Sequence, residues 1–118
     1  MHDVRDLGIR EIVDRTVAIV GDAPTFLSVD VDVLDPAFAP GTGTPEPGGM
    51  TSLDLLWACR ALAQRLRLVG MDVVEVIPSG VGSADVTALV AERVVREALT
   101  GLALRRGLTT GARPPEGV

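Results

Sequence analysis

The spacing of hydrophobic and polar residues predicts three helices separated by two strands in this chain of 118 residues. Apolar residues recur every three or four positions over residues 4–20, which is the period of a helix with one buried face. A turn containing Gly21 and Pro24 ends this helix. Residues 25–33 are rich in β-branched and apolar side chains, which predicts a strand covered on both faces.

The second half of the chain begins with a long loop. Residues 35–49 contain four prolines and four glycines, too many for a helix or strand. Thr51 then begins a helix, with Asp54 as its capping-box partner. The inner side of this helix is predicted to consist of Leu53, Leu55, Leu56, Ala58, Cys59 and Leu62. A second buried strand follows over residues 66–77 and ends at Pro78.

The last predicted helix covers residues 84–105, with Ser83 or Asp85 as its N-cap. A flexible connection over residues 78–83 leads into it. The order is therefore helix, strand, helix, strand, helix. Strands that alternate with helices are joined by right-handed crossovers and lie parallel in one sheet, so the predicted fold class is α/β.

The predicted sheet is too small to stand alone. Strands this apolar need a neighbouring strand on each edge. The chain therefore has the character of one end of a larger parallel sheet. We assign residues 1–106 to this portion of a domain and residues 107–118 to a flexible tail.

Composition restricts the function. Every one of the 11 basic residues is Arg, and the formal net charge is -5. This balance argues against a nucleic-acid partner, because no basic stripe stands out. No apolar run approaches the roughly 20 residues of a membrane span. The only cysteine, Cys59, excludes an intrachain disulfide and suits a reducing compartment. We therefore expect a cytoplasmic protein with no membrane partner.

Two carboxylates at the end of the first predicted strand are the candidate metal ligands. Asp30 and Asp32 are two residues apart, so in a strand both side chains leave the same face, about 6.6 Å apart at Cα. Carboxylates amid apolar sequence need a cation or hydrogen-bond donors, and hard oxygen ligands suit Mg²⁺, Mn²⁺ or Ca²⁺. Two metal ions could share the pair and activate a bridging water. The alternative is that both residues cap the strand end and accept turn amides.

Glu75 and Thr44 are the candidate substrate-binding residues. Glu75 lies near the carboxyl end of the second predicted strand, where a carboxylate can hold a planar guanidinium through two hydrogen bonds. An edge-strand Glu that faces solvent is the alternative. Thr44 lies in the loop that would wall the pocket, where it could bind a substrate or serve as a turn residue.

The sequence around these residues resembles a signature of the ureohydrolase family, which includes arginase and agmatinase, and the agmatinase branch is the closest match. The segments that carry the resemblance are Phe26-Leu27-Ser28-Val29-Asp30-Val31-Asp32-Val33-Leu34-Asp35-Pro36, Gly41-Thr42-Gly43-Thr44-Pro45-Glu46-Pro47-Gly48-Gly49 and Glu75-Val76-Ile77-Pro78. The resemblance covers all but the last dozen residues. It implies the C-terminal part of an arginase-like three-layer α/β/α fold with a parallel sheet.

The resemblance also implies a function. Family members hydrolyse the C–N bond of a guanidino (linear amidine) compound, such as agmatine, to give urea and an amine at a paired Mn²⁺ centre. By the family's pattern, Asp30 would bridge both manganese ions and Asp32 would bind one of them. Glu75 would hold the guanidinium of a small guanidino substrate, with Thr44 as a hydrogen-bond partner. Relatives commonly assemble, which implies a homo-oligomer for the full-length protein.

Part of the expected site is missing from the sequence. The resemblance implies further metal ligands in a Gly-Gly-Asp-His segment and an Asp-Ala-His-x-Asp segment, and the sequence contains neither. The isolated chain is therefore not expected to be a competent catalyst. The alternative function is a catalytically incompetent truncated remnant, or an interaction module of a ureohydrolase oligomer. A small phosphoacceptor-type signalling domain is disfavoured because the chain has no Lys.

The remaining reactive side chains are expected to have no catalytic role. His2 is the only histidine, lies far from the signature in sequence and is not matched to any family ligand. Cys59 lies on the apolar side of a predicted helix with no histidine nearby in the chain, so it is expected to be a small core residue.

Overall fold

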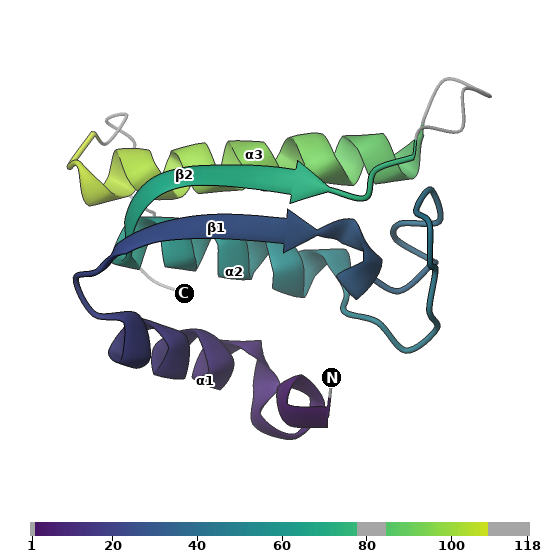
Figure 1. Ribbon diagram of the computed structural model, residues 1–118, viewed down its shortest axis with the longest axis horizontal. Coiled ribbons are helices and arrows are strands. Elements are labelled where there is room, and N and C mark those ends of the chain that lie inside the picture. Colours follow the sequence, from purple (N-terminus) through teal and green to yellow (C-terminus); the bar gives the residue numbers. More distant parts are fainter. Residues whose placement is uncertain (1, 78–84, 109–118) are drawn as a thin grey trace, which may run out of the picture.

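The computed structural model describes residues 2–77 and 85–108, and it has the predicted order of elements (Figure 1). Helix α1 (His2–Val20) is followed by strand β1 (Pro24–Asp30) and a single 3-10 turn, η1 (Val31–Val33). Helix α2 (Ser52–Arg65), strand β2 (Arg67–Val74) and helix α3 (Val86–Arg105) complete the described chain. The predicted connection over residues 78–83 lies outside the described residues, as does the predicted tail beyond Leu108.

The two strands lie side by side and parallel, as predicted. Asp30 at the end of β1 is opposite Val74 at the end of β2, so both carboxyl ends reach the same edge of the sheet. Helices α2 and α3 pack against each other on one face of the sheet, and α1 packs against α2 (Figure 1). The core joins these layers through Val29, Leu34, Ala39, Leu55, Cys59 and Val94.

The prediction that β1 is covered on both faces was wrong for the described part of the chain. Burial alternates along this strand: Leu27 and Val29 face α2, whereas Phe26, Ser28 and Asp30 are exposed on the other face. This alternation is the period of a strand with one covered face.

Hydrogen bonds at the helix ends confirm the predicted caps. The Thr51 hydroxyl oxygen accepts the Asp54 N–H at 3.1 Å and donates to the Asp54 carboxylate at 2.7 Å, which fixes the start of α2. Asp85 caps α3 by accepting the N–H groups of Thr87 and Ala88. The other predicted cap, Ser83, lies outside the described residues. Leu53 is 75% exposed, so its predicted place on the inner side of α2 was wrong.

Glycines shape two of the helices in different ways. α1 is interrupted at Gly8, which has a left-handed φ of 78° and joins two helical segments at a kink. On α3, Gly101 lies where the helix crosses α2. A Cβ at this position would lie 2.4 Å from the Arg60 carbonyl oxygen, so only glycine allows the two backbones to approach this closely.

Candidate metal and substrate site

Asp30 and Asp32 lie at the carboxyl end of β1, but not on one strand as predicted. β1 ends at Asp30, and Asp32 lies in the 3-10 turn η1. The strand ends there because the Asp30 Oδ1 accepts the N–H of Asp32 at 2.9 Å, which closes a tight turn. The Cα spacing of two residues on one strand therefore does not apply to Asp30 and Asp32. Asp30 caps the turn by accepting a backbone amide, which is the alternative given for it in the sequence.

Asp32 has a buried oxygen without a partner. Its Oδ2 accepts a hydrogen bond from the Thr44 hydroxyl. Its Oδ1 is buried and has no hydrogen-bond partner within the described part of the chain. A buried carboxylate oxygen in this state is costly, because it has lost water and gained no donor.

This orphaned oxygen fits a hard divalent cation, for which carboxylates are preferred ligands. The fit is partial. Among residues 2–77 and 85–108, no group of three His, Cys, Asp or Glu side chains is placed to hold a metal ion. Asp30 and Asp32 therefore supply part of a coordination sphere, and further ligands must come from water or from outside the described residues.

The loop that follows is closed at its base by Asp35. The Asp35 carboxylate accepts the N–H of Ala37 and the N–H of Gly48, each at 2.9 Å. These backbone hydrogen bonds, Ala37 first, hold the pKa of Asp35 below its ordinary value, although burial opposes them. Backbone bonds between Met50 and the segment Val33–Asp35 close the same neck at 2.8 and 3.0 Å. The loop is therefore a structured part of the site.

The middle of the loop is tied, through Gly41, to the segment that follows β2 and to α3. The Gly41 N–H donates to the Thr87 Oγ1 at 2.7 Å, and its carbonyl accepts the Ile77 N–H at 2.8 Å. Thr87 is fully buried. A Cβ on Gly41 would lie 2.7 Å from the Ile77 carbonyl oxygen, so the close approach requires glycine. These bonds bring the loop to the edge where both strands end.

Glu75 lies just beyond β2, because the strand ends at Val74 rather than at the predicted Ile77. Glu75 has a φ of 64°, in the left-handed region that costs a non-glycine residue about 1 kcal/mol or more. Its side chain is exposed, and its Oε2 would lie 3.4 Å from a Cβ placed on Gly43. The Glu75 carboxylate thus lies beside the residue that precedes Thr44. Asp30, Asp32, Thr44 and Glu75 are all found at one end of the sheet.

Sequence reasoning missed two residues that shape this site. The sequence pattern gives Asp35 no role beyond its place in the signature, and it does not indicate Thr87. The carboxylate of Asp35 could have been suspected from its place before Pro36 at the start of a Gly-rich loop. Thr87 gave no signal, because its contact with Gly41 spans 46 residues.

Cys59 has no part in the site. It is 2% exposed in the core beside α3. Burial, with a smaller contribution from the Glu97 charge, raises the pKa of its thiol to about 11. The thiol stays protonated at neutral pH, as expected for a core residue. The side chain of His2 lies outside the part of the structure that can be described.

No helix in residues 2–77 and 85–108 combines the length and hydropathy needed to cross a membrane.

The arginase family profile matches residues 1–101. Agmatinase from Enterobacter sp. (strain 638) is 46% identical over 104 residues, which cover 88% of this chain and 33% of that protein. The chain thus spans about a third of the length of the curated relatives it matches.

Solved structures give the same result. A hypothetical agmatinase from Burkholderia thailandensis is 41% identical, with a TM-score of 0.79 over 88% of this chain and 32% of that one. Proclavaminate amidino hydrolase from Streptomyces clavuligerus is 39% identical, with a TM-score of 0.80 over 88% of this chain and 35% of that one.

Proposed function

Because this chain belongs to the arginase family, we propose that it contributes to the manganese-dependent hydrolysis of a guanidino compound of the agmatine type to urea and an amine. The observation that carries the proposal is the buried, unpartnered Oδ1 of Asp32 at the end of β1. A bound cation would satisfy that oxygen. The names of the relatives, agmatinase and amidino hydrolase, support an amidino group as the substrate's reactive part.

In this proposal Asp30 and Asp32 hold the manganese ions. When bound, manganese supplies Lewis-acid polarisation and lowers the pKa of water. The Thr44 hydroxyl, which donates to the Asp32 Oδ2, fixes the orientation of this carboxylate. The Oδ1 of Asp32 is thereby left as the oxygen available to the metal.

Glu75 and Thr44 bind the substrate. The Glu75 carboxylate is exposed beside the loop and is free to take a guanidinium through two parallel N–H···O bonds. The left-handed backbone at Glu75 turns this side chain off the line of β2, toward the loop. Asp35 and Thr87 act as positioning residues, because they hold the two ends of the loop that carries Thr44.

Manganese binding by the 118-residue chain is the direct test. Mn²⁺ is paramagnetic and broadens the amide NMR signals of nearby residues. Addition of Mn²⁺ is expected to broaden residues 30–33, 43 and 44 first in the wild-type chain, and much less in Asp32→Asn. Asp22→Asn is the matched control, since Asp22 is exposed in the turn before β1. Broadening centred elsewhere, or unchanged in Asp32→Asn, would show that the metal assignment is wrong.

Hydrolysis is tested on the same samples by urea release from agmatine in the presence of Mn²⁺. Urea formation that is lost in Asp32→Asn and Glu75→Gln supports the assigned roles. Metal binding without urea would mean that the chain supplies ligands but needs the remaining part of the site from another polypeptide. In that case the chain is mixed with a longer relative that has been inactivated at its own Asp pair. Urea release is expected from the mixture that contains the wild-type chain, and not from mixtures that contain the variants.

Association with another ureohydrolase polypeptide is the second candidate function. It is favoured by the exposed apolar side chains on the uncovered sheet face and beside it, with Phe26 59% and Val69 65% exposed. Exposed apolar patches with open strand edges commonly mark interaction surfaces. Sedimentation of the chain alone and with a longer relative tests this candidate. A homo-oligomeric state and a cytoplasmic location remain part of the proposal.

A further inference from the structure

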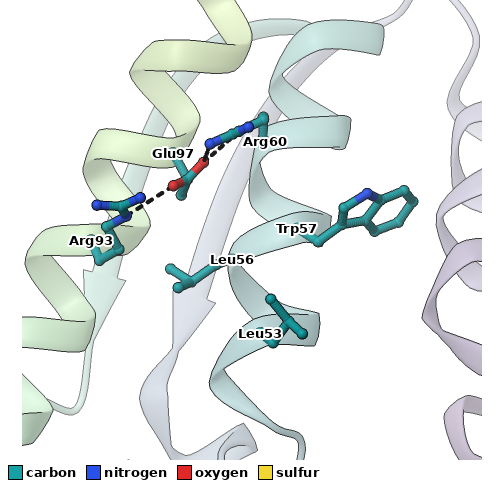
Figure 2. A pocket seen from close by; sticks show the side chains of 6 residues that line it. All are labelled: Leu53, Leu56, Trp57, Arg60, Arg93 and Glu97. Carbon is teal, nitrogen blue, oxygen red and sulfur yellow. Dashed lines mark hydrogen bonds and ion pairs between the residues drawn. The ribbon is translucent and has the colours of Figure 1, made fainter. Parts of the chain in front are cut away.

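A pocket of about 240 Å³ lies in the groove between α2 and α3, formed by residues that the candidate site does not use. Leu53, Trp57 and Arg60 come from α2, whereas Arg93 and Glu97 come from α3 (Figure 2). Leu56 completes the apolar wall. An engineered cavity of about 150 Å³ is large enough for benzene. The groove therefore has room for a ring or a branched chain together with one polar group.

The polar end of this pocket is built around a buried carboxylate. Glu97 is only 5% exposed, and it accepts hydrogen bonds from the guanidinium groups of Arg60 and Arg93 (Figure 2). Arg93 uses only its Nε in this ion pair, at 2.9 Å, so both of its Nη groups keep their donors for another acceptor. Glu97 thus orients the two guanidiniums on the rim.

The charge of the pocket is opposite to that of the chain. Two guanidiniums face one carboxylate in the lining, which leaves a net positive charge in a protein whose formal net charge is -5. A third guanidinium, from Arg10, lies 4.5 Å from the centre of the Trp57 ring. An anion is therefore the complementary ligand, and the arginine side chains, each about half exposed, can reach it from the rim.

We propose that the α2–α3 pocket binds a small organic carboxylate with an apolar body. The carboxylate is held by the free Nη groups of Arg93 and by Arg60, and the apolar body lies against Leu53, Leu56 and Trp57. This site is separate from the carboxyl ends of the strands, so a ligand there would act at a distance from the candidate metal site.

Trp57 makes the proposal testable on the wild-type chain, because it is the only tryptophan. Phenylacetate is the probe, and phenylacetamide, which has the same shape and no charge, is the matched control. Phenylacetate is expected to give a saturable change in Trp57 fluorescence at constant ionic strength, and phenylacetamide is expected to bind at least about tenfold more weakly. Equal responses to the two compounds, or no saturable response to phenylacetate, would overturn the proposal.

Two variants locate the site. Arg93→Met keeps the Arg60–Glu97 pair and is expected to weaken phenylacetate binding on the order of tenfold. Arg96→Met is the control, since Arg96 pairs with Glu92 outside the pocket. Loss of binding in both variants, or in neither, would contradict the assignment. A Trp57 signal that follows protein concentration instead of phenylacetate would show that a second copy of the chain occupies the groove.

Discussion

The crossing of α2 and α3 at Gly101 gives a prediction in which two physical effects have opposite signs. In the interior of a helix, Ala is more favourable than Gly by about 1 kcal/mol. Propensity alone therefore predicts that Gly101→Ala stabilises the chain. Packing predicts the reverse, because the added Cβ would lie 2.4 Å from the Arg60 carbonyl oxygen and 2.9 Å from the Ala63 Cβ.

The magnitude follows from those contacts. Ordinary contacts of this kind begin near 3.4 Å, so relief of the clash requires the helices to separate by about 1 Å, the difference from 2.4 Å. Overpacking of a well-packed core costs about 1–3 kcal/mol. Because the clash is with a backbone atom, which cannot rotate away, the cost is expected at the upper end of this range, about 2–3 kcal/mol. After the gain of about 1 kcal/mol in propensity, the free energy of unfolding is expected to fall by about 1–2 kcal/mol. Each kcal/mol lowers Tm by about 4–8 °C in a chain of this size.

Thermal unfolding followed by circular dichroism measures this effect. Ala18→Gly is the companion variant, because Ala18 is exposed on α1 and should lose about 1 kcal/mol from propensity alone. Both substitutions are thus expected to lower Tm, although one introduces a glycine and the other removes one. A Tm for Gly101→Ala equal to or above the wild-type value would refute the close-crossing argument.

Three further predictions concern the loop and the end of β2. The pKa of Asp35 is lower in the folded chain than its ordinary value of 3.8. The carboxylate therefore contributes its full stabilisation above pH 3.8, and this stabilisation is lost as pH falls through the folded-state pKa. Measurement of Tm against pH should show this loss on the acid side in the wild-type chain and not in Asp35→Asn. Thr87→Val should lower the free energy of unfolding by about 1–3 kcal/mol, because the Gly41 N–H loses its acceptor. Thr100→Val removes only an exposed hydrogen bond within α3 and should lower it less. Faster hydrogen exchange at the Gly41 amide in Thr87→Val would show that the lost bond is the cause. Glu75→Gly should be more stable than Glu75→Ala by about 1 kcal/mol, because glycine adopts the left-handed φ without strain. Equal urea-denaturation midpoints for these two variants would contradict that account.

The order of elements could be predicted because each has a local cause. The caps Thr51 and Asp85 mark the starts of α2 and α3 in the sequence, and glycines and prolines mark the loop. The parallel arrangement of β1 and β2 follows from a helix between them. Such signals involve residues only a few positions apart.

The end of β1 could not be predicted from the same pattern. Alternating Val and Asp over residues 29–33 fits a strand, but it fits equally well a turn closed by an Asp side chain. The hydrogen bond from the Asp32 N–H to Asp30 decides between them, and the order of residue types alone does not show whether it forms. The hydrogen bond between Gly41 and Thr87 is harder still to predict, because a prediction of it requires the position of α3 relative to the loop. Leu53 shows the same limit on α2, since the apolar pattern does not reveal that its position is uncovered.

The buried thiol of Cys59 makes the chain its own reporter of local opening. Alkylating reagents react with thiolates, and this thiol is both inaccessible and, with its raised pKa of about 11, almost entirely protonated near neutral pH. Reaction therefore requires that α2 separate from β1 and α3 long enough to expose the sulfur. Since no other cysteine competes, the labelling rate measures how often the core opens. That rate should fall whenever a ligand or another polypeptide holds α2 in place.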